Sequence, residues 1–133
     1  MNETPFVLIV EDDPFYSKIC STKLAKEGVA TKMVDNGSDA LALIREEHPG
    51  LVLLDLIMPG KNGFEILTEM KSDPVMKNIP VMVISNMSEP EDIQRIMDLG
   101  ALDYLVKANV PIQEVVDKVK YHLQVLNTPP AES

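Results

Sequence analysis

The sequence predicts an α/β fold in which an open, doubly wound sheet of five parallel strands is covered by helices on both faces. Short apolar runs alternate five times with segments of helical spacing along the 133 residues. The step is roughly 20–30 residues, which suits one strand and one helix. Most of the runs are continuously apolar, as is typical of strands buried on both faces. Five strand–helix units are too few for a closed eight-unit barrel, so the pattern favours an open sheet.

The five expected strands are short and rich in Val, Ile and Leu. They cover residues 6–10, 30–34, 51–54, 81–84 and 104–106. The second run, Ala-Thr-Lys-Met-Val, is more mixed than the others, and this predicts a strand at an edge of the sheet.

The expected helices between the strands cover residues 14–27, 38–47, 63–71, 90–99 and 111–126. At the first helix, Asp13 is a typical N-cap, Pro14 a typical first-turn residue and Gly28 a typical end signal. From their spacing, the side chains of this helix that we expect to share the buried face are Phe15, Ile19, Cys20 and Leu24.

The composition indicates one acidic domain over residues 1–126, with residues 127–133 as a flexible tail or linker stub. Lys and Arg number 12 against 21 Asp and Glu, a net charge of −9. We expect no direct binding to nucleic acid or membranes, because both require a basic or strongly apolar surface. The single Cys excludes an internal disulfide and multi-cysteine zinc sites. The N-terminus lacks the positive region of a signal peptide, so we expect a cytoplasmic protein.

Polar side chains directly follow four of the expected strands. They are Glu11, Asp12, Asp55, Ser85, Asn86 and Lys107. Because the carboxyl ends of parallel strands meet at one rim, where ligands bind in such sheets, we expect these side chains to lie close together. A solvent-exposed side chain at a strand end is the alternative for each residue taken alone.

The acidic residues in this set indicate a cation site. Asp55 interrupts an apolar run, where a lone carboxylate is costly unless it is paired or binds a metal. Glu11 and Asp12 would repel each other and Asp55 without a cation. Oxygen ligands without Cys or His favour Mg²⁺, with Mn²⁺ as the alternative. With Lys107 and a hydroxyl beside it, the set is typical of phosphoryl transfer to a carboxylate.

Four motifs resemble the receiver domains of two-component response regulators, in particular the single-domain chemotaxis type. They lie at residues 7–13 (VLIVEDD), 53–60 (LLDLIMPG), 80–85 (PVMVIS) and 100–107 (GALDYLVK), and the resemblance covers about residues 5–126. It implies a flavodoxin-like sandwich with strand order 2-1-3-4-5. It also implies a signalling switch, not an enzyme acting on other substrates: the chain catalyses only its own phosphorylation and slow dephosphorylation.

The resemblance assigns Asp55 as the acceptor of a phosphoryl group from a phosphohistidine on a histidine kinase or histidine phosphotransfer protein. It implies Mg²⁺ bound by Asp12, Asp55 and the backbone carbonyl of Ile57, with Glu11 acting largely through water. A downstream protein, which the sequence does not identify, would read the change. A phosphorylation-dependent homodimer stays open.

The resemblance also implies a set of residues that respond to phosphorylation. Lys107 would pair with the phosphoryl oxygens and Ser85 would move to bond them. Tyr104 would change rotamer with Ser85, although an aromatic packed at the sheet edge is an equal alternative for Tyr104. Asn86 stands where a smaller residue is common and could narrow access to the site.

Further departures concern the loops around the site. Ala108 replaces the usual proline after Lys107, and a trans peptide bond is expected there because a cis bond without proline costs about 2.5–4 kcal/mol. Ile57 and Met87 are apolar and cannot orient an attacking water, which predicts slow self-dephosphorylation. The alternatives to the switch are an interaction module of the same fold that does not use phosphorylation, a Mg²⁺-dependent phosphatase and a flavin-binding protein.

Overall fold

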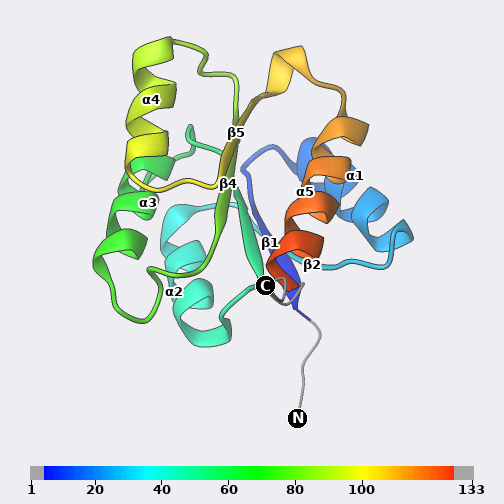
Figure 1. The fold of residues 1–133 in the computed structure, drawn as a ribbon, viewed down its shortest axis with the longest axis horizontal. Helices are drawn as coiled ribbons and strands as arrows, with labels where there is room; N and C mark the ends of the chain where they lie inside the picture. The colour runs from blue at the N-terminus through cyan, green and yellow to red at the C-terminus, as the bar shows by residue number, and fades with distance from the viewer. Residues whose placement is uncertain (1–4, 128–133) are drawn as a thin grey trace, which may run out of the picture.

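The computed structural model describes residues 5–127, in which strands and helices alternate along the chain (Figure 1). The strands are β1 (Phe6–Val10), β2 (Ala30–Val34), β3 (Leu51–Leu54), β4 (Val81–Ser85) and β5 (Asp103–Val106). The helices are α1 (Pro14–Lys26), α2 (Gly37–Glu47), α3 (Gly63–Ser72), α4 (Pro90–Asp98) and α5 (Ile112–Asn127), with a short 3₁₀ turn, η1 (Lys107–Asn109), before α5. Every predicted element is present, and no boundary differs by more than one residue. Of the predicted tail, residues 128–133 lie outside the described residues.

The five strands form one parallel sheet in the order β2-β1-β3-β4-β5, which confirms the predicted fold class and strand order. The chain begins on β1 in the interior of the sheet, runs out to β2 and then crosses back past β1 to β3. The winding therefore reverses between β1 and β3, where Val10 pairs with Leu54 at the strand ends. In open α/β sheets this reversal leaves a crevice for ligands outside the strand ends. The mixed run at residues 30–34 is an edge strand, as predicted.

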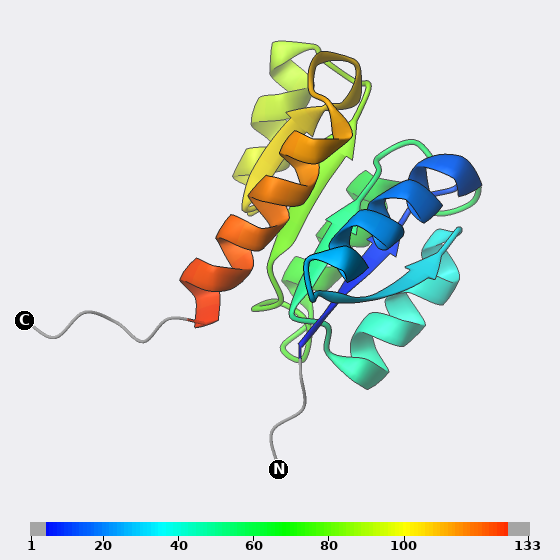
Figure 2. The ribbon, with the colours of Figure 1, turned by 90° about the vertical axis from the view of Figure 1, so that its right-hand side faces the viewer.

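The sheet is sandwiched between two layers of helices. Helices α2, α3 and α4 cover one face and α1 and α5 cover the other (Figures 1 and 2). Within β1, Leu8 and Val10 point into the core beneath α2–α4, whereas Val7 and Ile9 point into the core beneath α1 and α5. Because both faces are buried, the strand has no polar alternation, which explains the continuous apolar runs of the sequence. None of the described helices is long and apolar enough to cross a lipid bilayer.

The predicted buried face of α1 is partly wrong. Cys20 and Leu24 are buried as expected, but Phe15 is 80% exposed and Ile19 is 43% exposed. The buried side chains of the helix are instead Ser17, Cys20 and Leu24, which recur on one side of the helix, and Cys20 and Leu24 belong to the core beneath α1 and α5. Phe15 lies two residues before Ser17, about 200° around an α-helix, and therefore faces solvent. The small hydroxyl side chain of Ser17 gave no apolar signal for this face.

The start of α3 is held directly against the strand that carries Asp55. Asn62 and Glu65 form a capping box, in which each side chain accepts a hydrogen bond from the other residue's N–H at 3.0 Å. At Gly63 a Cβ would lie 2.6 Å from Leu56 Cα and 2.9 Å from the Asp55 carbonyl oxygen. Only glycine therefore allows the helix to begin this close to the end of β3.

Candidate functional site

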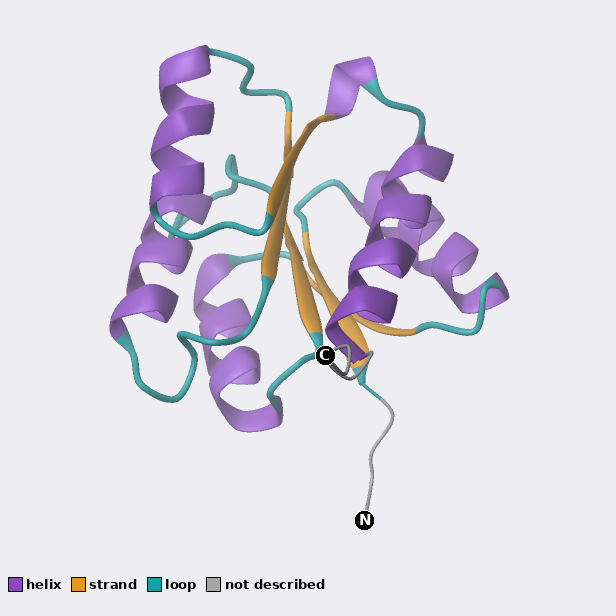
Figure 3. Cartoon of the chain, viewed as in Figure 1, coloured by secondary structure: helices purple, strands orange, loops and turns teal. Residues whose placement is uncertain are grey.

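The carboxyl ends of the strands lie at the same edge of the sheet, the upper edge in Figure 3. Glu11 and Asp12 follow β1, Asp55 follows β3, and Lys107 follows β5. One carboxylate oxygen from each of Glu11, Asp12 and Asp55 lies within 4.8 Å of the others. We call these three residues the acid cluster. Glu11 and Asp55 are buried, while Asp12 is exposed and forms the side of the cluster that faces solvent.

Lys107 joins two members of the acid cluster. Its Nζ lies 3.0 Å from Asp55 Oδ2 and makes an ion pair with Glu11 Oε1. Glu11 Oε1 receives no hydrogen bond of normal geometry within the described residues, so this contact is mainly electrostatic. The ammonium also lies 4.5 Å from the centre of the Tyr16 ring. Among the described residues, Glu11 and Asp55 thus share Lys107 and Asp12 makes no ion pair with it, so the three carboxylates together keep an excess of negative charge.

Backbone N–H groups orient the two buried carboxylates. The N–H of Ile57 donates to Asp55 Oδ1 at 3.2 Å, and the N–H of Asp13 donates to Glu11 Oε2 at 3.1 Å. Both oxygens of Asp55 therefore have a partner, one from the loop after β3 and one from Lys107. The Ile57 side chain is 57% exposed.

Burial and charge shift the acidity of two of these groups. Burial raises the pKa of Glu11 to about 7; Lys107 and the N–H of Asp13 oppose the rise, and the Asp55 charge adds to it. Burial lowers the pKa of Lys107, but its interactions with the Glu11 and Asp55 carboxylates more than offset this and leave the pKa above its usual value. The site therefore contains a stable ammonium beside a carboxylate that holds its negative charge only weakly.

The donor set fits a divalent cation with hard oxygen ligands. The acid cluster offers three carboxylates within 4.8 Å of one another, and no Cys or His belongs to it. A cation there would compensate the charge that Lys107 leaves unpaired, and Mg²⁺ and Mn²⁺ prefer such ligands. Glu11 and Asp12 also line an open pocket of about 500 Å³ beside the start of α1 and the end of β2.

Ser85 and Tyr104 meet at the backbone of Met87 and make no direct bond to the acid cluster. Ser85 is fully buried and its Oγ accepts a hydrogen bond from the Met87 N–H at 3.2 Å. The Tyr104 hydroxyl donates to the Met87 carbonyl oxygen at 2.5 Å, while the Tyr104 ring packs against the core beneath α2–α4. Asn86, which lies between Ser85 and Met87 in the chain, is exposed. The loop after β4 is therefore held at Met87 from two sides.

Two features of this region were not predicted from the sequence. The sequence singles out Met87 only for its apolar side chain, and the contacts of its backbone could not be predicted because its partners depend on tertiary packing. Tyr16 had a weaker signal: it lies in the first turn of a helix whose N-cap, Asp13, accepts a hydrogen bond from the Tyr16 N–H at 3.3 Å. That position brings its ring back toward the strand ends and Lys107.

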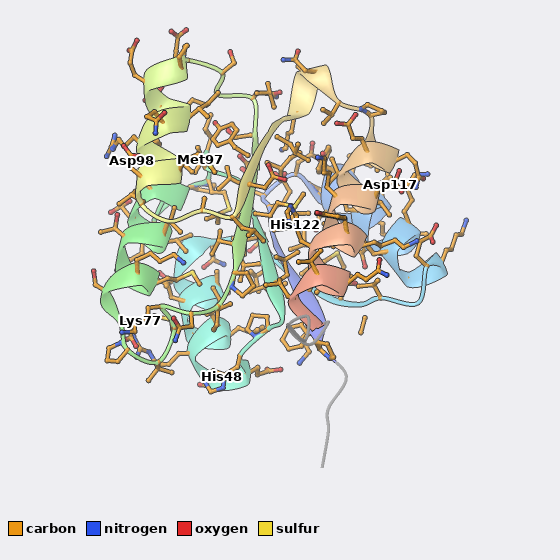
Figure 4. All side chains as sticks on the ribbon, in the orientation of Figure 1. His48, Lys77, Met97, Asp98, Asp117 and His122 are labelled. Atoms are coloured by element: carbon orange, nitrogen blue, oxygen red, sulfur yellow. The ribbon has the colours of Figure 1, made fainter. Side chains whose placement is uncertain are left out.

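Neither histidine belongs to the site. His48 ends α2 at the lower end of the molecule in Figure 4. His122 lies on α5, and its Nε2 is 2.8 Å from Asp103 Oδ2. The peptide bond between Lys107 and Ala108 is trans, as expected, since no cis bond occurs in the described part of the chain.

Comparison with known proteins gives consistent matches. The response regulator receiver domain family matches residues 7–120. The DNA-binding response regulator MtrA of Mycolicibacterium smegmatis is 33% identical over 126 residues, 95% of this chain and 54% of MtrA, so the chain spans about half the length of that relative. The phosphorylated cyanobacterial phytochrome response regulator RcpA superposes with a TM-score of 0.82 at 30% identity, covering 97% of this chain and 100% of RcpA. The Mn²⁺-bound form of response regulator Rcp1 superposes with a TM-score of 0.77 at 26% identity, covering 97% and 99%.

Proposed function

The chain belongs to the response regulator receiver domains, and from that premise we propose that it is a phosphorylation-controlled switch in which Asp55 accepts a phosphoryl group from a phosphohistidine. The observation that carries this proposal is the pairing of Asp55 with Lys107 at 3.0 Å inside the acid cluster. A lone buried carboxylate would be costly, whereas a phosphoacceptor needs this charge surrounded by a cation site and an ammonium.

The chemical step uses an Asp55 oxygen as nucleophile. The oxygen forms a bond to phosphorus while the bond from phosphorus to the histidine nitrogen of the donor breaks, and the leaving imidazole nitrogen takes up a proton. The Ile57 N–H and Lys107 orient the two Asp55 oxygens before attack. Lys107 then neutralises charge on the transferred phosphoryl oxygens. Mg²⁺ held by the acid cluster would supply further neutralisation of these oxygens.

The acid cluster would hold this metal. Receiver domains bind a divalent metal, and Rcp1 has a Mn²⁺-bound form. In our proposal Asp12 and Asp55 bind Mg²⁺ directly with the Ile57 backbone carbonyl, and Glu11 acts largely through water. Mn²⁺ would fit the same oxygen donors.

The loop after β4, held at Met87, would convert phosphorylation of Asp55 into a change in the protein surface around this loop and Tyr104. Phosphorylation adds about −1.5 to −2 charge. Ser85, now bonded to the Met87 N–H, would turn to the phosphoryl group, and Tyr104 would lose its fixed partner when the Met87 carbonyl moves. RcpA, a similar receiver, is known in a phosphorylated form. Asn86, exposed in the same loop, would limit access to the site.

The partners proposed are a histidine kinase or histidine phosphotransfer protein as donor and a protein as reader, in the cytoplasm. MtrA is a DNA-binding regulator about twice as long as the matched region, so the prediction that this chain itself makes no contact with nucleic acid stays a prediction. A homodimer formed on phosphorylation stays equally open.

The proposal is tested by measuring the intact mass of the protein after incubation with acetyl phosphate. We expect one added phosphoryl group with Mg²⁺, none with EDTA and none in Asp55→Asn. Asp117→Asn, which changes an exposed acid on α5, is the matched control and should be phosphorylated normally. No adduct with Mg²⁺ would favour the interaction module, and steady release of phosphate from several substrates would favour a phosphatase.

A further inference from the structure

The ammonium of Lys107 is bounded by two carboxylates and by the face of an aromatic ring. It lies 3.0 Å from Asp55 Oδ2, contacts Glu11, and lies 4.5 Å from the ring centre of Tyr16. The Lys107 side chain is only 13% exposed. An aromatic face attracts a cation within about 6 Å, more strongly when the cation is partly removed from water. Tyr16 has no part in the phosphoryl transfer described above.

The ring of Tyr16, and not its hydroxyl, makes this contact. The hydroxyl is buried and has no hydrogen-bond partner within the described residues. Burial raises the pKa of the Tyr16 phenol, and Cys20, Glu11 and Asp55 act in the same direction. The phenol therefore stays protonated and its ring face keeps the charge distribution that attracts an ammonium.

We propose that Tyr16 is a positioning residue that holds the Lys107 ammonium against Glu11 and Asp55 and thereby sets how strongly a divalent cation must compete for the acid cluster. The inference rests on the proposed metal site. Two of the three carboxylates of the acid cluster, Glu11 and Asp55, are the ones that Lys107 contacts, so the cation and the ammonium would compete for them. A cation entering the cluster displaces the ammonium from Glu11 and from its place over the ring. Without the Tyr16 ring, the Lys107 ammonium would be held less firmly against the carboxylates, and the divalent cation would bind to the acid cluster more tightly.

The test is a calorimetric measurement of the Mg²⁺ dissociation constant of the full chain, at one pH and ionic strength. We expect Tyr16→Leu to bind Mg²⁺ about fivefold more tightly than the wild type, the size of one cation–π contact of intermediate strength. Tyr16→Phe keeps the ring and should stay within about twofold of the wild type. The matched control is Phe15→Leu, which removes the neighbouring, 80% exposed ring and should change nothing.

The same substitution in a Lys107→Ala background separates positioning from a general effect on packing. Without the ammonium, Tyr16→Leu should leave the Mg²⁺ affinity unchanged. Thermal unfolding shows whether each variant is folded, and Tyr16→Met replaces Tyr16→Leu if the latter is not. Equal affinities of the wild type and Tyr16→Leu, or equal tightening with and without Lys107, would overturn the role of Tyr16 and leave the metal site standing. Absence of Mg²⁺ binding in every variant would overturn the metal site and this inference together.

Discussion

We expect Mg²⁺ binding to weaken as the pH falls, because a proton on the buried carboxylate of Glu11 removes a negative charge that favours the cation, even where Glu11 acts through water. Glu11 is 3% exposed, and burial raises its pKa to about 7. Below that value one proton must leave for each metal bound. At about pH 6 roughly nine in ten Glu11 carboxyls hold a proton, and at about pH 8 roughly one in ten do. The dissociation constant should therefore be about tenfold larger at about pH 6 than at about pH 8.

Isothermal titration calorimetry at constant ionic strength measures this dependence, and buffers of different ionisation enthalpy count the protons released. The matched variant is Glu11→Gln, which cannot titrate; it should bind Mg²⁺ more weakly at high pH and with little dependence on pH. Wild-type constants within about twofold of each other from about pH 6 to pH 8 would refute the reasoning. A full tenfold dependence in Glu11→Gln would refute it as well, because another group would then titrate.

The raised pKa of Glu11 also affects the stability of the metal-free protein, which should decrease as the pH rises, whereas Mg²⁺ binding should become stronger. Between about pH 4.5 and pH 7 the folded protein holds a proton on Glu11 that the unfolded chain has already released. The free energy of unfolding should therefore fall as the pH rises through this range, and Glu11→Gln should remove that contribution. Denaturant unfolding at several pH values measures both.

Two further substitutions test the site and its loops. Gly63→Ala places a Cβ 2.6 Å from Leu56 Cα, so we expect a melting temperature lower by roughly 3–10 °C and slower phosphorylation of Asp55. The control is Gly28→Ala, at φ +83 in open space, which should destabilise the fold without slowing phosphorylation. Equal phosphorylation rates for both variants would disprove the link between Gly63 and the site. Met87→Glu adds a carboxylate that can orient water and should speed loss of the phosphoryl group by roughly tenfold. Met97→Glu on α4 is the control and should leave the decay rate unchanged. An unchanged decay rate in Met87→Glu would show that the apolar side chain at position 87 does not slow hydrolysis.

Most of the fold could be predicted from the sequence because its determinants are local. The apolar runs, the Asp13–Pro14 start of α1 and the Gly28 end signal each fix an element without reference to distant residues. The exposed face of α1 could not be predicted from apolar spacing. Phe15 is large and apolar but faces solvent, and the small Ser17 takes the buried position.

The acid cluster could be predicted because parallel strands bring their ends to one rim. Asp55 and Glu11 needed only the strand order to be placed together. The contact between Lys107 and Tyr16, and the bonds at Met87, depend on side-chain packing between elements far apart in the chain. A single sequence contains no pattern that reports such contacts.

The role of Asp55 as phosphoacceptor is tested most directly by locating the phosphoryl group on the chain. Borohydride reduces an acyl phosphate to an alcohol, which converts a phosphorylated Asp into homoserine, and peptide mass spectrometry then identifies the position. After treatment with Mg²⁺ and acetyl phosphate we predict homoserine at position 55 and unmodified Asp at positions 12 and 13. Homoserine at another position with Asp55 intact, or no reduced residue in the phosphorylated protein, would contradict the proposed mechanism.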